Sequence, residues 1–203
     1  MNANKGLIST IYSYRRIRSN TFKRFYESNF ICKLLLALGM ACLTGLGAQL
    51  KIFLPFTPVP FTGQIFFVLL SGTLLGRYGG LSQAIYVGIG CLVVPWFAAG
   101  TGGGVEVLIG VTGGYLIGFI IASTIIGMFT ERYLTARGLK FQLLIMLLGI
   151  GIIYVFGAIQ FSLLMHTGFQ KTMILAVIPF ISLDILKAIS TALISTAILP
   201  KKN

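Results

Sequence analysis

The sequence predicts an all-α integral membrane protein of six membrane-spanning helices, with both termini on the cytoplasmic side. Hydrophobic residues make up 56% of the 203 residues and charged residues only 10%, whereas a soluble domain carries about 25% charged residues. The mean hydropathy is +0.93. Several long apolar segments also approach the roughly 20 residues that a helix needs to cross a membrane. These observations exclude an ordinary water-soluble domain.

The expected helices cover residues 31–50, 60–76, 80–97, 105–128, 141–164 and 180–199. The second and third are short, and only a few residues around Arg77 separate them, so they are expected to form a tight hairpin. The sixth is expected to begin after Pro179, because proline is tolerated only in the first turn of a helix.

The distribution of basic residues predicts the orientation. With the N-terminus inside, thirteen of the sixteen Lys and Arg residues lie in cytoplasmic segments and only Lys51 and Lys171 lie outside. This bias is the positive-inside pattern of plasma-membrane proteins. Because both ends of the chain are basic, the number of spans is expected to be even. The remaining basic residue, Lys187, falls within the sixth helix.

The chain divides into a basic cytoplasmic or juxtamembrane segment, residues 1–30, and a helical domain, residues 31–203. The first segment interleaves apolar and basic residues, which suits either contact with an anionic leaflet or a tail that only sets topology. The net charge of +12 does not indicate a nucleic-acid partner, because the basic residues lie between helices and not on one face.

Asp184 and Lys187 are the most distinctive pair within the spans. Three residues apart on a helix, they share a face and can reach each other. Charged residues inside membrane spans are costly and usually functional. The pair is expected to bind the polar, planar part of a ligand, although a purely structural ion pair is the alternative.

Other candidate ligand contacts surround the outer side of the bundle. The glycine-rich run 100–104, which includes Gly102 and Gly103, is expected to be a flexible loop that caps a ligand, or a plain connector. It matches neither a P-loop nor a dinucleotide-binding motif. A proline-punctuated loop leads into the second helix, and the further candidates are Phe61, Thr62, Gln64, Tyr86, Trp96 and Tyr115.

Small residues recur every fourth position on two helices. Ala37, Ala41 and Gly45 lie on the first helix, and Gly110, Gly114, Gly118 and Ala122 lie on the fourth. Such stripes allow close helix packing in lipid. The stripe on the fourth helix is expected to pack inside the bundle, and the stripe on the first is either an internal face or a docking face for another membrane subunit.

The sequence offers no candidate for catalysis. His166 is the single histidine, and no nucleophile–base, carboxylate-pair or metal-ligand spacing occurs. No catalytic residue, metal site or cofactor is therefore expected.

Several motifs together resemble the BioY family, the biotin-specific substrate-binding (S) components of energy-coupling-factor (ECF) transporters. The motifs are PVPFTGQ at 58–64, FFVLLSGTLLGRYGGLSQ at 66–83, the loop 100–104, TGGYLIGF at 112–119 and the segment 179–188. The resemblance covers residues 31–199.

This resemblance implies a six-helix S-component bundle that holds biotin near the outer side. Asp184 and Lys187 match the family's charged pair, which is expected to bind the ureido ring of biotin. The loop 100–104, with Thr112, Gly113 and Tyr115, matches segments expected to close over the vitamin. Ala37 and Ala41 match the motif by which S components dock on a transmembrane coupling subunit, which favours docking for the first stripe.

The expected function is therefore high-affinity biotin capture, together with a coupling subunit and two cytoplasmic ATPase subunits, and not an enzymatic activity. One alternative is a self-sufficient secondary transporter for biotin or another small vitamin. Such a transporter needs a coupling-ion site, yet only Asp184 lies within the spans, and no inverted repeat is visible. The other alternative is a structural subunit without a ligand.

Overall fold

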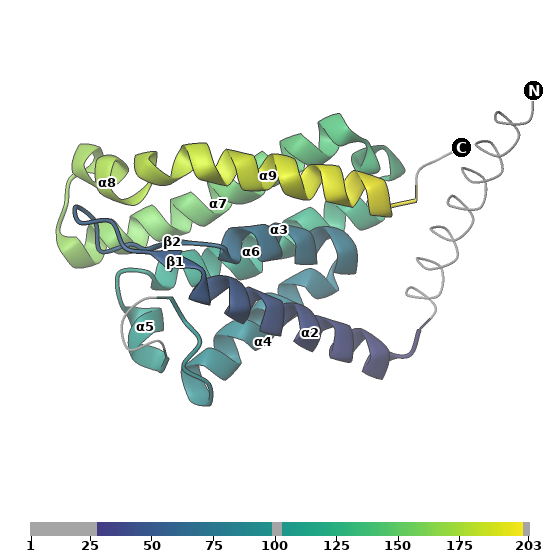
Figure 1. Cartoon of the computed structure of the whole chain (residues 1–203), viewed down its shortest axis with the longest axis horizontal. Helices are drawn as coiled ribbons and strands as arrows, with labels where there is room; N and C mark the ends of the chain where they lie inside the picture. The colour runs from purple at the N-terminus through teal and green to yellow at the C-terminus, as the bar shows by residue number, and fades with distance from the viewer. Residues whose placement is uncertain (1–27, 99–102, 201–203) are drawn as a thin grey trace, which may run out of the picture.

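The structure, a computed structural model, describes residues 28–98 and 103–200. Within these ranges the chain is helical apart from one small strand pair (Figure 1). Most of the basic segment predicted over residues 1–30 lies outside the described residues, and so does Gly102. The elements are α2 (Phe30–Gln49), β1 (Lys51–Ile52), β2 (Phe61–Thr62), α3 (Gln64–Leu75), α4 (Tyr78–Leu92), α5 (Val105–Ile109), α6 (Gly113–Arg132), the 3₁₀ helix η1 (Leu134–Arg137), α7 (Leu139–Met165), α8 (Phe169–Ala176) and α9 (Ile178–Ile198).

Each of the six predicted segments overlaps one of the longer helices, and these helices differ in length. In the described part of the chain, α2, α6, α7 and α9 are long and apolar enough to cross a membrane. Helices α3 and α4 have only 12 and 15 residues, which at 1.5 Å per residue gives about 18 and 22 Å. The structure thus confirms the all-helical class and identifies four candidate spans. The count of six crossings and the side of the termini remain predictions.

Two predicted helix boundaries are corrected. The segment 105–128 is not one helix, because α5 ends at Ile109 and α6 begins only at Gly113. Helix α9 begins at Ile178, so Pro179 lies in its first turn, where the missing backbone N–H costs no helical hydrogen bond. Both boundaries lie beside the pocket described below.

Helix α6 lies at the centre of the bundle and packs against α3, α4 and α7. The contact with α7 depends on its glycines, since a Cβ atom added at Gly118 would lie 2.8 Å from the Cα atom of Ile153. Gly114 also approaches α7 closely, at the backbone of Phe156. The prediction of internal packing is confirmed for Gly114, Gly118 and Ala122, whereas Gly110 lies before α6 and meets only the backbone of α5.

The small residues on α2 also face inward, against α3 and α4. Ala37 and Ala41 have no exposed surface, and a Cβ atom added at Gly45 would lie 2.8 Å from the Trp96 ring. Within this chain the stripe therefore packs internally. Docking of another membrane subunit on it stays a prediction.

Candidate functional site

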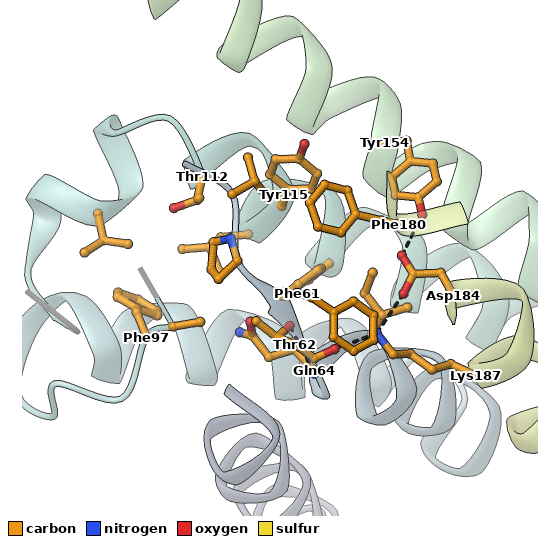
Figure 2. A pocket seen from close by; sticks show the side chains of 17 residues that line it. Phe61, Thr62, Gln64, Phe97, Thr112, Tyr115, Tyr154, Phe180, Asp184 and Lys187 are labelled. Atoms are coloured by element: carbon orange, nitrogen blue, oxygen red, sulfur yellow. Dashed lines mark hydrogen bonds and ion pairs between the residues drawn. The ribbon is translucent and has the colours of Figure 1, made fainter. Parts of the chain in front are cut away.

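A pocket lies where the strand pair meets the first turns of α3 and α6 and the first half of α9 (Figure 2). About 560 Å³ of space in and around it is not occupied by atoms, part of it open to the outside. Its lining residues are Val59, Pro60, Phe61, Thr62, Gln64, Ile65, Phe97, Ala98, Val107, Thr112, Tyr115, Leu116, Phe119, Tyr154, Phe180, Asp184 and Lys187.

Among the described residues that line the pocket, only Asp184 and Lys187 are charged, and both lie on α9. One helical turn separates them, and the Lys187 ammonium donates to Asp184 Oδ1 at 2.7 Å. The Asp184 side chain is 2% exposed and that of Lys187 14%. The predicted contact within the pair is therefore confirmed, in a nearly dry environment that strengthens charge-assisted hydrogen bonds.

Lys187 also ties α9 to the strand pair. Its ammonium donates to the backbone carbonyl of Thr62 at 2.5 Å and lies 3.9 Å from the centroid of the Phe61 ring. The chain direction explains this contact, because β2 runs straight into α3 through Gly63, whose N–H donates to the carbonyl oxygens of Gly47 and Leu50. The pocket wall is thus anchored to α2 on one side and α9 on the other.

Tyr154, on α7, completes this polar cluster. Its hydroxyl donates to Asp184 Oδ2 at 2.6 Å, so both carboxylate oxygens have a donor (Figure 2). An ionised carboxylate accepts hydrogen bonds only, and two donors from different helices fix the plane of this one.

Two further hydrogen bonds position polar side chains in the pocket wall. Gln64 donates to the hydroxyl of Tyr86 at 2.7 Å, and the Tyr115 hydroxyl donates to the Ala176 carbonyl at 2.6 Å. The second bond links α6 to the end of α8, directly before α9. Both side chains are buried.

The rest of the pocket is largely apolar. Aromatic rings come from several elements, among them Phe61, Phe97, Phe119 and Phe180. A site with one polar cluster and aromatic walls suits a small molecule with a polar, planar end and an apolar body. Among the described residues, no group of three His, Cys, Asp or Glu side chains could hold a metal ion.

The BioY family model matches residues 19–202, nearly the whole chain. The chain belongs to the BioY family. Its BioY relatives include the probable biotin transporter BioY of Methanothermobacter thermautotrophicus, which is 45% identical over 143 residues, 66% of this chain and 89% of that protein. The biotin transporter BioY of Thermotoga maritima is 39% identical over 150 residues, 73% of this chain and 85% of that protein.

A solved structure agrees with this BioY assignment. The crystal structure of the S-component for biotin from an ECF-type ABC transporter superposes with a TM-score of 0.74 at 27% sequence identity. The match covers 82% of this chain and 89% of that one. The fold is therefore the S-component fold that the sequence motifs of the BioY family implied.

The pocket of this BioY-family chain brings together many of the predicted site residues. Those that line it are Phe61, Thr62, Gln64, Thr112, Tyr115, Asp184 and Lys187. They come from segments far apart in the sequence. Lys187 and Thr62, which are joined by a hydrogen bond, are 125 residues apart.

Other predicted residues lie outside the pocket lining. Tyr86 is fully buried behind Gln64, and the Trp96 ring stacks on it at 5.3 Å between centroids. Gly113 packs against Leu108 and Gln160. Gly103 borders a separate shallow depression beside Pro95. Tyr86 and Trp96 therefore lie behind the wall at Gln64, whereas Gly103 lies at a different depression.

Sequence reasoning missed Tyr154, Phe97, Phe119 and Phe180 as lining residues. Phe180 could have been predicted from the sequence, because it lies one turn before Asp184 and shares its helix face. Tyr154 could not have been predicted, since its contact with Asp184 joins residues 30 positions apart on two helices. One aromatic residue in an apolar helix does not indicate its partner.

Proposed function

We propose that this chain captures biotin in the pocket and serves as the substrate-binding subunit of an ECF-type vitamin transporter. The observation that carries the proposal is the Asp184–Lys187 pair, held in the wall of an aromatic pocket, in a chain of the BioY family. Relatives named as biotin transporters support the choice of ligand.

The chemistry of biotin matches the two ends of the pocket. Its ureido ring carries a carbonyl that accepts hydrogen bonds and two N–H groups that donate them, so Lys187 is the donor and Asp184 the acceptor for this ring. The ring carbonyl replaces the Thr62 carbonyl as an acceptor for Lys187. The sulfur-containing ring and the methylene groups of the biotin side chain then pack against the aromatic walls. This packing excludes water and strengthens the polar contacts.

In this proposal the chain crosses the plasma membrane six times, and α3 and α4 are two short crossings joined by a tight turn at Arg77. The basic residues Arg77, Arg132 and Lys140 lie at the end away from the pocket, which the positive-inside rule assigns to the cytoplasm. The pocket then opens outward. A transmembrane coupling subunit and two cytoplasmic ATPase subunits supply the energy, in line with the ECF context of the solved S-component.

Titration of the purified, biotin-free chain with labelled biotin tests the proposal. Wild type is expected to bind one biotin per chain. Asp184→Asn is expected to weaken binding at least about tenfold, because a hydrogen bond to a charged group contributes about 1.5–3 kcal/mol. The matched control is Glu131→Gln, which removes the carboxylate of the Arg77–Glu131 ion pair at the opposite end of the bundle.

The control is expected to bind biotin as wild type does. A folded, monodisperse wild-type protein that binds no biotin contradicts the biotin assignment. Equal losses in Asp184→Asn and Glu131→Gln contradict the location of the site.

A further inference from the structure

A second site with both charged and apolar walls lies at the other end of α6. An open groove runs between the turn that joins α3 to α4 and the last turns of α6. Its lining residues are Arg77, Met128, Phe129, Glu131, Arg132 and Tyr133. The groove lies at the end where α2 begins and α9 ends, far from the pocket (Figure 1).

Arg77 is held in a fixed orientation on one wall. Its Nη2 lies 2.8 Å from Glu131 Oε1, its Nε lies 3.2 Å from the same oxygen, and its backbone N–H donates to Oε2 at 3.2 Å. Gly76, with a φ of 58°, lets the chain turn tightly here. The Arg77 side chain is nevertheless 69% exposed, so an oriented guanidinium faces the outside of the bundle.

Arg132 supplies a second guanidinium in the lining of the groove. Its Cζ lies 5.7 Å from the centroid of the Tyr133 ring, and that ring lies 6.1 Å from the ring of Phe129. No carboxylate in the described ranges pairs with Arg132. Among the described residues, the charged groups that line the groove are two guanidinium groups and one carboxylate, and Lys33 lies near enough for its charge to act on Glu131.

Below these charges the groove is apolar. Met128 is 52% exposed and Phe129 40% exposed, and both belong to the last turns of a candidate membrane span. Tyr133 follows the span, at the depth where aromatic side chains gather at membrane interfaces. A soluble anion such as phosphate has no apolar part to pack against these side chains, whereas a phospholipid carries its phosphate next to hydrocarbon chains.

We propose that this groove binds the headgroup of an anionic phospholipid, with the phosphate on Arg77 and Arg132 and the acyl chains along Met128 and Phe129. Arginine forks match phosphate oxygens in geometry, and anionic lipid is enriched in the cytoplasmic leaflet. The site would anchor the end of α6 in the leaflet opposite the pocket. It does not depend on the identity of the transported ligand.

Native mass spectrometry of the delipidated full chain tests the site. Phosphatidylglycerol and phosphatidylcholine of equal chain length are titrated separately, and inorganic phosphate serves as a soluble competitor. Wild type is expected to retain phosphatidylglycerol in preference to phosphatidylcholine. Arg132→Gln is expected to weaken retention about fivefold, since one basic residue near the surface contributes about 1 kcal/mol.

The matched control is Lys171→Gln, which removes another exposed basic residue, one that also lies beside exposed apolar side chains, Phe169 and Ile174. This variant and the biotin affinity of Arg132→Gln are expected to match wild type. Equal retention by Arg132→Gln and wild type overturns the proposal, as does equal retention of the two lipids or an equal loss in Lys171→Gln. Displacement of the lipid by equimolar inorganic phosphate identifies a soluble-anion site instead.

Discussion

Asp184 sits between two donors on different elements, the ammonium of Lys187 and the hydroxyl of Tyr154. A buried carboxylate with a donor on each oxygen has a fixed plane, which a free carboxylate on a flexible side chain lacks. Preorganisation of this kind reduces the entropy that is lost when a ligand binds. In the proposed complex Asp184 and Lys187 meet the polar end of the ligand, and Tyr154 orients Asp184.

Tyr154→Phe tests this division. The variant keeps the aromatic wall and removes only the hydroxyl that orients Asp184, so biotin affinity is expected to fall about tenfold, the size of one hydrogen bond to a charged group. The matched control is Tyr115→Phe, which removes a hydroxyl from the same pocket that bonds to the Ala176 carbonyl and not to Asp184. Titration with labelled biotin measures both. Wild-type affinity in Tyr154→Phe, or an equal loss in the two variants, would contradict an orienting role for the Tyr154 hydroxyl.

The ion pair also makes a prediction for stability. Lys187→Met leaves the Asp184 carboxylate buried without its cation, and loss of one partner of a buried pair costs about 3–5 kcal/mol. The variant is therefore expected to unfold at a clearly lower temperature in detergent. The double variant Asp184→Asn/Lys187→Met is expected to recover part of this loss. A double variant as unstable as the sum of the two single variants would show that the residues do not interact.

At the scale of helices, close contacts through glycine hold the bundle together. The α6–α7 contact brings the two backbones so near at Gly118 that a side chain has no room. Hydrophobic burial from water does not drive helices together within lipid, so such packing is a main source of stability there. The pocket depends on this contact, because Tyr115 and Tyr154 project from these two helices.

Gly118→Val is expected to destabilise the chain by about 1–3 kcal/mol, the usual cost of overpacking. Gly151→Val is the control on the same helix pair, because a Cβ atom there meets nothing within 4 Å. Thermal unfolding in detergent measures both variants. Equal melting temperatures for the Gly118 variant and wild type would contradict the close contact.

The helical elements could be predicted from composition because long apolar segments leave few alternatives. What could not be predicted depends on tertiary contacts. The segment from Gly110 to Thr112 interrupts a continuous apolar stretch. Nothing local distinguishes Gly110 from the packing glycines that follow. The stripe Ala37, Ala41 and Gly45 illustrates the same limit, since its spacing fits an internal face and a docking face equally well. The Trp96 ring packs against Gly45 within the chain, a contact that the spacing could not predict.

The candidate site was predictable to the extent that its chemistry is local. Asp184 and Lys187 are conspicuous as charges in an apolar helix, and their spacing alone places them on one face. The aromatic wall was only partly predictable, because Trp96 and Tyr86 stack on each other behind the pocket while Phe119 and Phe180 line it. All three residue types suit both places.

For the whole molecule, the account predicts a polar arrangement across the membrane. The pocket lies at one end, and the groove that contains Arg77 and Arg132 lies at the other. In this arrangement the thirteen basic residues of the cytoplasmic segments favour the inner leaflet. In this predicted arrangement the pocket takes its ligand from outside.

Labelling of single cysteines on intact cells tests this orientation. In a chain whose three native cysteines are replaced, Lys171→Cys is expected to react with a membrane-impermeant maleimide. Lys140→Cys is expected to react only after lysis. Both side chains are exposed on the molecule, so accessibility in the membrane decides the result. The reverse pattern would place the pocket on the cytoplasmic side.

A crystal or electron cryomicroscopy structure of the chain with biotin is the most direct test of the central claim. The account predicts the ureido ring at the polar end of the pocket, with its carbonyl oxygen on Lys187 Nζ and an N–H group on Asp184. Biotin bound elsewhere, or bound with its ureido ring away from these two side chains, would contradict the account.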